Sequence, residues 1–139
     1  MTTDYKFTPE QEAWLRDLET TEEPQTKGYL HRIIPAQGYD AGYCCLGRAC
    51  VVLEVEESFL GEIGFFNGRD NVLTNATVTK LGLRDECGSF DESVDGSENF
   101  EDGYDSLVEM NDDGKTFKEI ASYIRDNPEN VFLQPWENQ

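Results

Sequence analysis

The stretch that decides the fold is Tyr43-Cys44-Cys45-Leu46-Gly47-Arg48-Ala49-Cys50-Val51-Val52-Leu53. Its apolar side chains recur at the spacing of one helix face, at Cys45, Leu46, Ala49, Cys50 and Leu53. Val51 and Val52 extend the apolar surface around most of the helix, which is typical of a helix enclosed by other elements. We therefore expect a central, buried helix over 43–53, and Gly47 indicates close packing of another element against it.

Other elements are expected on both sides of this central helix. Capping boxes that begin at Thr8 and Thr116 predict helices over 9–20 and 117–127. Weaker signals predict a helix over 75–81, a helical turn over 106–111, strands over 29–34 and 59–66, an edge strand over 131–133 and a turn at Asn67-Gly68. The expected class is α+β: one small domain over 1–139, with more helix than strand and a small antiparallel sheet around the central apolar helix.

The charge of the chain is strongly unbalanced. Its 139 residues include 29 Asp and Glu but only 11 Lys and Arg, so the formal charge is -18. Such a surface repels phosphate groups, and we expect neither direct nucleic-acid binding nor a membrane partner. No apolar run approaches about 18 residues, and the first residues lack the order of a signal peptide. We therefore expect a cytoplasmic protein with reduced thiols.

The acidic residues gather in one segment. Residues 85–114 hold 12 of the 29 acids and no Lys or Arg. We interpret 85–105 as an acidic loop inserted in the domain, because the segment has few large apolar residues. Asn111 and Asp112 at its end are interpreted as turn-forming residues that bond backbone groups.

Three segments stand out by their residue types and their order. They are Gln-Thr-Lys-Gly-Tyr-Leu at 25–30, Gly-Tyr-Cys-Cys-Leu-Gly-Arg-Ala-Cys at 42–50, and Leu-Val-Glu-Met-Asn-Asp-Asp-Gly-Lys-Thr-Phe-Lys-Glu-Ile-Ala at 107–121. Together they resemble a widespread group of small proteins encoded by tailed phages and prophages. Members of that group carry Cys-Cys-Leu-Gly-x-x-Cys and Asn-Asp-x-Gly-x-[Ser/Thr]-Phe-x-Glu-Ile-Ala motifs. Trp14 and Leu81-Gly82-Leu83 fit the same order.

The resemblance implies a setting, a phage gene product acting in a bacterial host, and implies no particular chemistry. This chain departs from the group by the acidic insertion between Leu83 and Leu107, and by Arg48-Ala49 where apolar residues are usual. We expect a ligand-specific role to lie in those departures.

A nucleophilic thiol is one candidate chemistry. Cys44 stands where the central helix begins, a position at which the helix dipole lowers the pKa of a thiol, and His31 is the candidate base. No glycine-rich oxyanion element accompanies them, and the four cysteines and single histidine lack the paired spacing of a zinc site. Cysteines that pack the core explain the pattern better, so a thiol- or metal-dependent hydrolase is the third alternative.

An anion pocket is the second candidate. Lys27, His31, Arg32 and Arg48 make 24–53 the only net-positive stretch, and such a pocket suits the phosphates of a nucleotide signal. The competing interpretation is that these cations are paired with the many carboxylates of the chain.

Calcium is a weaker candidate. The ligand positions of a calcium loop fall on Asp91, Ser93, Asp95, Asn99 and Asp102. Helical flanks are missing and Glu98 stands where an aliphatic residue is usual, so we expect no resident cofactor and at most weak calcium binding.

The function expected from these observations is non-enzymatic. We expect an acidic phage accessory protein that binds a host protein with a basic surface, for host take-over or counter-defence, with nucleic-acid mimicry as one form of that binding. The partner-binding residues would be Asp91, Asp95, Glu101 and Asp102. The oligomeric state is left open.

Overall fold

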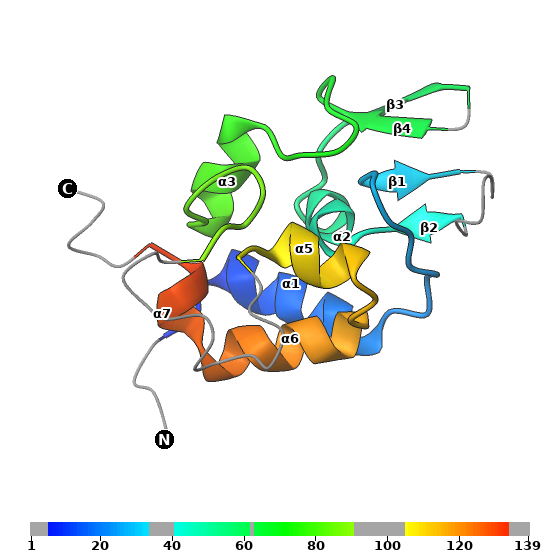
Figure 1. Ribbon diagram of the computed structural model, residues 1–139. Coiled ribbons are helices and arrows are strands. Elements are labelled where there is room, and N and C mark those ends of the chain that lie inside the picture. The colour runs from blue at the N-terminus through cyan, green and yellow to red at the C-terminus, as the bar shows by residue number, and fades with distance from the viewer. Residues whose placement is uncertain (1–5, 34–40, 62, 91–104, 134–139) are drawn as a thin grey trace.

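The computed structural model describes residues 6–33, 41–61, 63–90 and 105–133 (Figure 1). Its helices are α1 (Pro9–Thr20), α2 (Cys45–Val52), α3 (Asn75–Leu81), α5 (Leu107–Asp112), α6 (Phe117–Asp126) and α7 (Pro128–Val131). Its strands are β1 (His31–Arg32), β2 (Gly42–Tyr43), β3 (Glu57–Leu60) and β4 (Ile63–Phe66). The fold is therefore α+β, a single small domain with more helix than strand, as the sequence predicts.

Helix α2 lies at the centre of the described structure. It packs against α1 and α5, and Figure 1 shows it between the sheet at one end of the molecule and α3 and α7 at the other. The predicted core residues Cys45, Leu46, Ala49 and Cys50 are buried, whereas Leu53, the C-cap residue, is only partly buried. A Cβ on Gly47 would overlap the backbone carbonyl of Leu30, so the close packing expected at this glycine is confirmed.

The four strands form one antiparallel sheet in the order β2-β1-β4-β3. The single strand expected over 59–66 is wrong, because the chain reverses at Gly61, where φ is +63°, and forms the β3–β4 hairpin. The strand expected over 29–34 is shorter: within 29–33, the described part of that range, it consists of His31 and Arg32. The Asn67-Gly68 turn is confirmed: both residues have positive φ, and the backbones of Phe66 and Arg69 exchange hydrogen bonds across it.

Both predicted capping boxes are present. The Thr8 side chain accepts a hydrogen bond from the backbone of Gln11, whose own side chain accepts one from the Thr8 backbone. Thr116 and Glu119 form the same pair at the start of α6. Each box satisfies two N–H groups that a helix start leaves without a partner, so these helices begin where their sequences predict.

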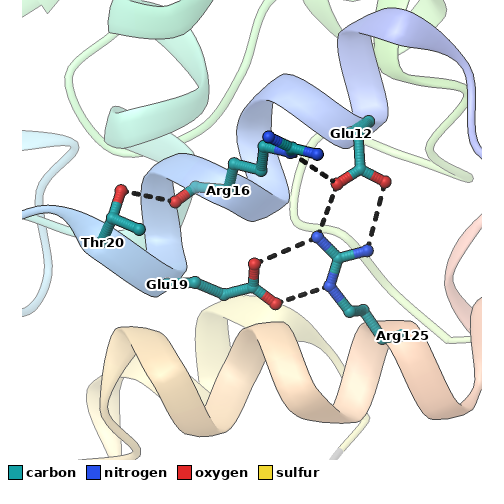
Figure 2. A network of polar contacts seen from close by, with 5 residues as sticks. All are labelled: Glu12, Arg16, Glu19, Thr20 and Arg125. Atoms are coloured by element: carbon teal, nitrogen blue, oxygen red, sulfur yellow. Dashed lines mark hydrogen bonds and ion pairs between the residues drawn. The ribbon is translucent and has the colours of Figure 1, made fainter.

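Helices α1 and α6 lie side by side and are joined by a charged bridge (Figure 2). The Arg125 guanidinium donates to both carboxylate oxygens of Glu19, at 2.5 and 3.0 Å, and to both of Glu12, at 3.2 and 2.7 Å. Hydrogen bonds from Arg125 lower the pKa of Glu12. These side chains are about one-third exposed, so water screens the bridge and its contribution to stability is modest.

The end of the described chain differs from the expectation. The edge strand predicted over 131–133 is wrong, because Pro128 begins a further helical turn, α7, immediately after Asn127 ends α6. Phe132 then forms only an isolated antiparallel bridge with Leu83.

Residues on either side of the segment 91–104 are held together. Ser89 pairs with Ser106, and the Phe90 N–H donates to the Asp105 carbonyl at 2.9 Å. The Phe90 ring packs on Tyr123 of α6. The predicted helical turn over 106–111 is confirmed as α5, with Ser106 as its N-cap. Among the described helices, none combines the length and the apolar character needed to span a membrane.

Candidate functional site

The three segments that carry the phage-protein resemblance meet at one buried side chain, Asn111. Its Oδ1 accepts hydrogen bonds from Gln25 Nε2 at 2.8 Å and from the Cys45 backbone N–H at 3.1 Å. Its Nδ2 donates to the Thr26 carbonyl at 2.8 Å. Asn111 has no exposed surface, so its amide forms a rigid junction between the 25–30 segment, the start of α2 and the end of α5.

Backbone pairing fixes the geometry around this junction. The Thr26 N–H donates to the Tyr43 carbonyl at 2.8 Å, and the Tyr43 N–H donates to the Pro24 carbonyl at 3.0 Å. Gly42 lies so close to Pro24 that a Cβ would overlap its carbonyl. The segment at 24–26 therefore lies directly beside β2, and it contacts Asn111 together with the start of α2.

A pocket of about 150 Å³ opens beside the junction. It is lined by Gly28, Tyr29, Cys44, Asn71, Val72, Val108, Asn111 and Asp112. Asp112 Oδ1 accepts a hydrogen bond from the Gly28 N–H at 3.1 Å, which joins two of the lining residues and holds the carboxylate at the pocket wall. The pocket thus combines apolar walls with one carboxylate.

Cys44 caps the start of α2 and also lines this pocket. Its sulfur accepts a hydrogen bond from the Gly47 N–H at 3.4 Å, and 5% of the residue is exposed. Burial, with a smaller contribution from the negative charge of Asp112, raises the pKa of the Cys44 thiol to about 12. The thiol is neutral near pH 7, so the geometry does not support a nucleophilic thiolate here.

His31 has different partners. Its Nδ1 lies 2.5 Å from Glu57 Oε2, and its ring stacks on Tyr43 with centroids 3.9 Å apart. Gly64 makes room for this pair, because a Cβ there would meet both side chains. Among the described residues, the side-chain hydrogen bonds of His31 and Cys44 go to Glu57 and Gly47, so none joins the candidate nucleophile to the candidate base.

The predicted anion-binding cations are held by separate partners. Arg48 pairs with Asp17 through two hydrogen bonds of 2.6 and 2.8 Å and lies over the Tyr43 ring. Arg32 is buried with its guanidinium over Tyr29. Lys27 is exposed, and its Nζ lies near Gly114. Tyr43 thus contacts both His31 and Arg48, and none of the four predicted residues lines the pocket beside Asn111.

The loop candidates lie outside the described residues. They are the partner-binding candidates Asp91, Asp95, Glu101 and Asp102 and the calcium candidates Asp91, Ser93, Asp95, Asn99 and Asp102. Across 6–33, 41–61, 63–90 and 105–133, no group of three or more His, Cys, Asp or Glu side chains could hold a metal ion.

Sequence reasoning missed the junction and its pocket. The expectation that Asn111 and Asp112 bond backbone groups is confirmed, but the groups belong to distant segments: Asn111 reaches Thr26 and Gln25, 85 and 86 residues away. The sequence does offer one signal of this junction. Gln25 and Asn111 both lie in the motifs of the resemblance, and a buried amide needs hydrogen-bond partners.

Comparison with known proteins gives this chain no relative: no family model, no curated protein and no solved structure matches it. Its function is therefore inferred from its residues and their arrangement.

Proposed function

We propose that this protein is a non-enzymatic phage accessory protein that binds a basic surface of a host protein in the host cytoplasm. Its phage origin rests on the three motif segments quoted above. Its binding role rests on two observations: the arginines have partners within the chain, and many of the acids are exposed on the surface of the domain.

The observation that carries this proposal is that the arginines interact with partners within the same chain. Arg16, Arg48, Arg69 and Arg125 form ion pairs with carboxylates of the same chain. Arg84 donates to the backbone carbonyls of Glu129 and Phe132, and Arg32 is buried against Tyr29. Because these cations have partners inside the chain, the excess of acids is left for an external cation.

The place of the acidic segment supports the same proposal. Residues 85–90 and 105–113 flank the 91–104 segment, and their described acids include Asp105, Glu109, Asp112 and Asp113, all exposed. The pairing of Ser89 with Ser106 holds the residues on the two sides of this segment next to each other on the domain. Clustered charge of one sign speeds the encounter with a surface of the opposite sign.

The pocket beside Asn111 suits a protein side chain better than a nucleotide. Its volume of about 150 Å³ is smaller than the roughly 300–1,000 Å³ typical of small-molecule sites. Its one charged lining residue is Asp112, which would repel a phosphate group. Mimicry of nucleic acid is the finer form of this proposal, in which the partner is a nucleic-acid-binding protein.

The test is affinity capture from a bacterial lysate with two matched variants. The loop variant carries Asp91→Asn, Asp95→Asn, Glu101→Gln and Asp102→Asn. The control carries Glu22→Gln, Glu23→Gln, Glu54→Gln and Glu56→Gln, four exposed acids outside the loop. Both variants raise the formal charge of -18 by four. We expect one host protein to bind the wild type and the control, to be lost with the loop variant, and to elute as salt rises.

Equal capture by both variants would contradict a role for the loop acids. A captured protein that a DNA duplex displaces would support mimicry, whereas one that DNA leaves bound would restrict the proposal to a basic protein surface. The variant Lys27→Ala/Arg32→Ala tests the anion-ligand alternative, and we expect its capture to equal that of the wild type.

A further inference from the structure

We propose that the pocket beside Asn111 binds a single lysine side chain of the basic partner. This inference rests on the proposed function, because it names the group of the partner that is anchored. The pocket lies between α5, the start of α2 and the segments at 28–29 and 71–72.

The size of the pocket suits one side chain. A cavity of about 150 Å³ accommodates a group the size of benzene. Tyr29, Val72 and Val108 provide apolar surface, against which the four methylene groups of a lysine can pack. A nucleotide or a long peptide would not fit in this volume.

The charge of the pocket selects a cation. Asp112 is the one formally charged residue among those that line it. Lys27 precedes Gly28 in the chain but does not line the pocket, and its Nζ lies near Gly114. Cys44, another titratable residue of the wall, is a neutral thiol near pH 7 and adds no charge to that of Asp112.

The hydrogen bonding of Asp112 favours lysine over arginine. Its Oδ1 is already occupied by the Gly28 N–H, and within the described residues no hydrogen bond reaches Oδ2. An ammonium group is a compact point charge that needs one oxygen, whereas a guanidinium prefers to bind two carboxylate oxygens at once.

The pocket is also rigid before binding. The Asn111 amide ties α5 to the Cys45 N–H and to Thr26, and Ser106 caps the start of α5. When a partner side chain enters a preformed site, only its own conformational entropy is lost, because the residues of the pocket wall are already ordered.

In the first experiment the full chain is titrated with n-butylammonium at constant ionic strength, and binding is detected by ¹⁵N NMR. We expect shifts at the amides of Gly28 and Val108 and at the Asn111 side-chain NH₂. Methylammonium, which lacks the stem, n-butylguanidinium and 1-butanol should each bind more weakly. Equal shifts with methylammonium and n-butylammonium, or none at these three positions, would overturn the proposal.

Two pairs of variants locate the interaction. Asp112→Asn keeps an oxygen for the Gly28 N–H but removes the charge, and it should weaken n-butylammonium binding about three- to fivefold, because Asp112 is itself exposed. Asp113→Asn, the neighbouring exposed acid, should change it less than about twofold. Val72→Phe should fill the pocket and abolish binding, whereas Val51→Phe, on the exposed surface of α2, should not. Equal effects within either pair would overturn the assignment.

The two proposals fail separately. In the loop variant described above, n-butylammonium should bind the pocket as it binds the wild type, because the changed residues are not among those that line it. Loss of host-protein capture with intact butylammonium binding supports the loop and the pocket as distinct contacts. Host-protein capture that is unaltered by Asp112→Asn and by Val72→Phe would overturn the lysine anchor and leave standing the proposal of a partner with a basic surface.

Discussion

At the scale of single residues, burial determines the chemistry that a side chain can perform. Cys44 stands at a helix start, where the dipole favours a thiolate, yet burial has the larger effect and raises the pKa of its thiol to about 12. Its sulfur instead accepts the Gly47 N–H, the hydrogen bond that a serine cap would make. Cys44 is therefore a structural residue that caps α2 and closes one wall of the pocket.

This assignment predicts how stability depends on pH. The pKa of Cys44 is raised above its unfolded value near 9.0, so the unfolded chain loses the proton first as the pH rises. The contribution of the neutral thiol is complete below about pH 9 and is lost as the pH approaches 12. Cys44→Ser retains the cap and does not titrate. Above pH 9 its free energy of unfolding should fall less steeply than that of the wild type, by up to about 1.4 kcal/mol per pH unit.

Urea denaturation at pH 7, 9, 10 and 11 under reducing conditions measures this difference. Parallel pH profiles for the wild type and Cys44→Ser would contradict this prediction, because they would show that the thiol has the same pKa in the folded and the unfolded chain. Retained capture of the host protein by Cys44→Ser is expected as well, because binding does not require a nucleophile.

At the scale of elements, α2 and Leu30, the residue before β1, are in unusually close contact. Gly47 faces the Leu30 backbone, and the Cys44 N–H donates to the Leu30 carbonyl at 3.1 Å. Trp14 of α1 donates from its indole to the Cys45 carbonyl at 2.9 Å on another side of the same helix. Helix α2 is thus positioned by backbone contacts on two sides, which leaves no room for a larger side chain at Gly47.

The substitution Gly47→Ala tests this contact, because the contact decides whether the free energy of unfolding rises or falls. In a helix without such a neighbour, Gly→Ala stabilises by roughly 0.5–1 kcal/mol. Here the added methyl group would overlap the Leu30 carbonyl, so we expect the free energy of unfolding to fall by about 1–3 kcal/mol instead. Chemical denaturation of the two proteins at pH 7 measures the change, and a stabilised variant would show that the two elements can separate at little cost.

At the scale of the whole molecule, charge is the dominant feature. Twenty-nine acids and eleven bases give a formal charge of -18, and the folded state brings these charges closer than the unfolded chain does. Added salt shortens the Debye length from about 30 Å at 0.01 M to about 3 Å at 1 M. Salt screens both the repulsion and the ion pairs, but the repulsive pairs outnumber the attractive ones.

We therefore expect salt to stabilise the fold. Thermal unfolding in 10 mM and 500 mM NaCl should show a Tm that rises by several degrees, and KCl should have the same effect because screening depends on ionic strength. The loop variant, with four fewer negative charges, should show a smaller rise. A Tm that falls with salt would mean that ion pairs such as Arg125 with Glu12 and Glu19 outweigh the repulsion.

The sequence alone determined the features that depend on neighbours three or four residues apart. The capping boxes at Thr8 and Thr116, the Asn67-Gly68 turn and the buried face of α2 are local hydrogen-bonding and periodicity patterns, and the structure confirms each of them. From these local patterns the helices and the α+β class follow.

Only the tertiary structure decided which distant groups meet. Arg48 pairs with Asp17, 31 residues earlier in the chain, and Asn111 forms hydrogen bonds with segments far away in the chain. The reversal at Gly61 and the helical turn at Pro128 likewise replace the strands that residue preferences suggested. The physical reason is that strand pairing, ion pairing and burial depend on which surfaces are packed together, and spacing along the chain does not encode that packing.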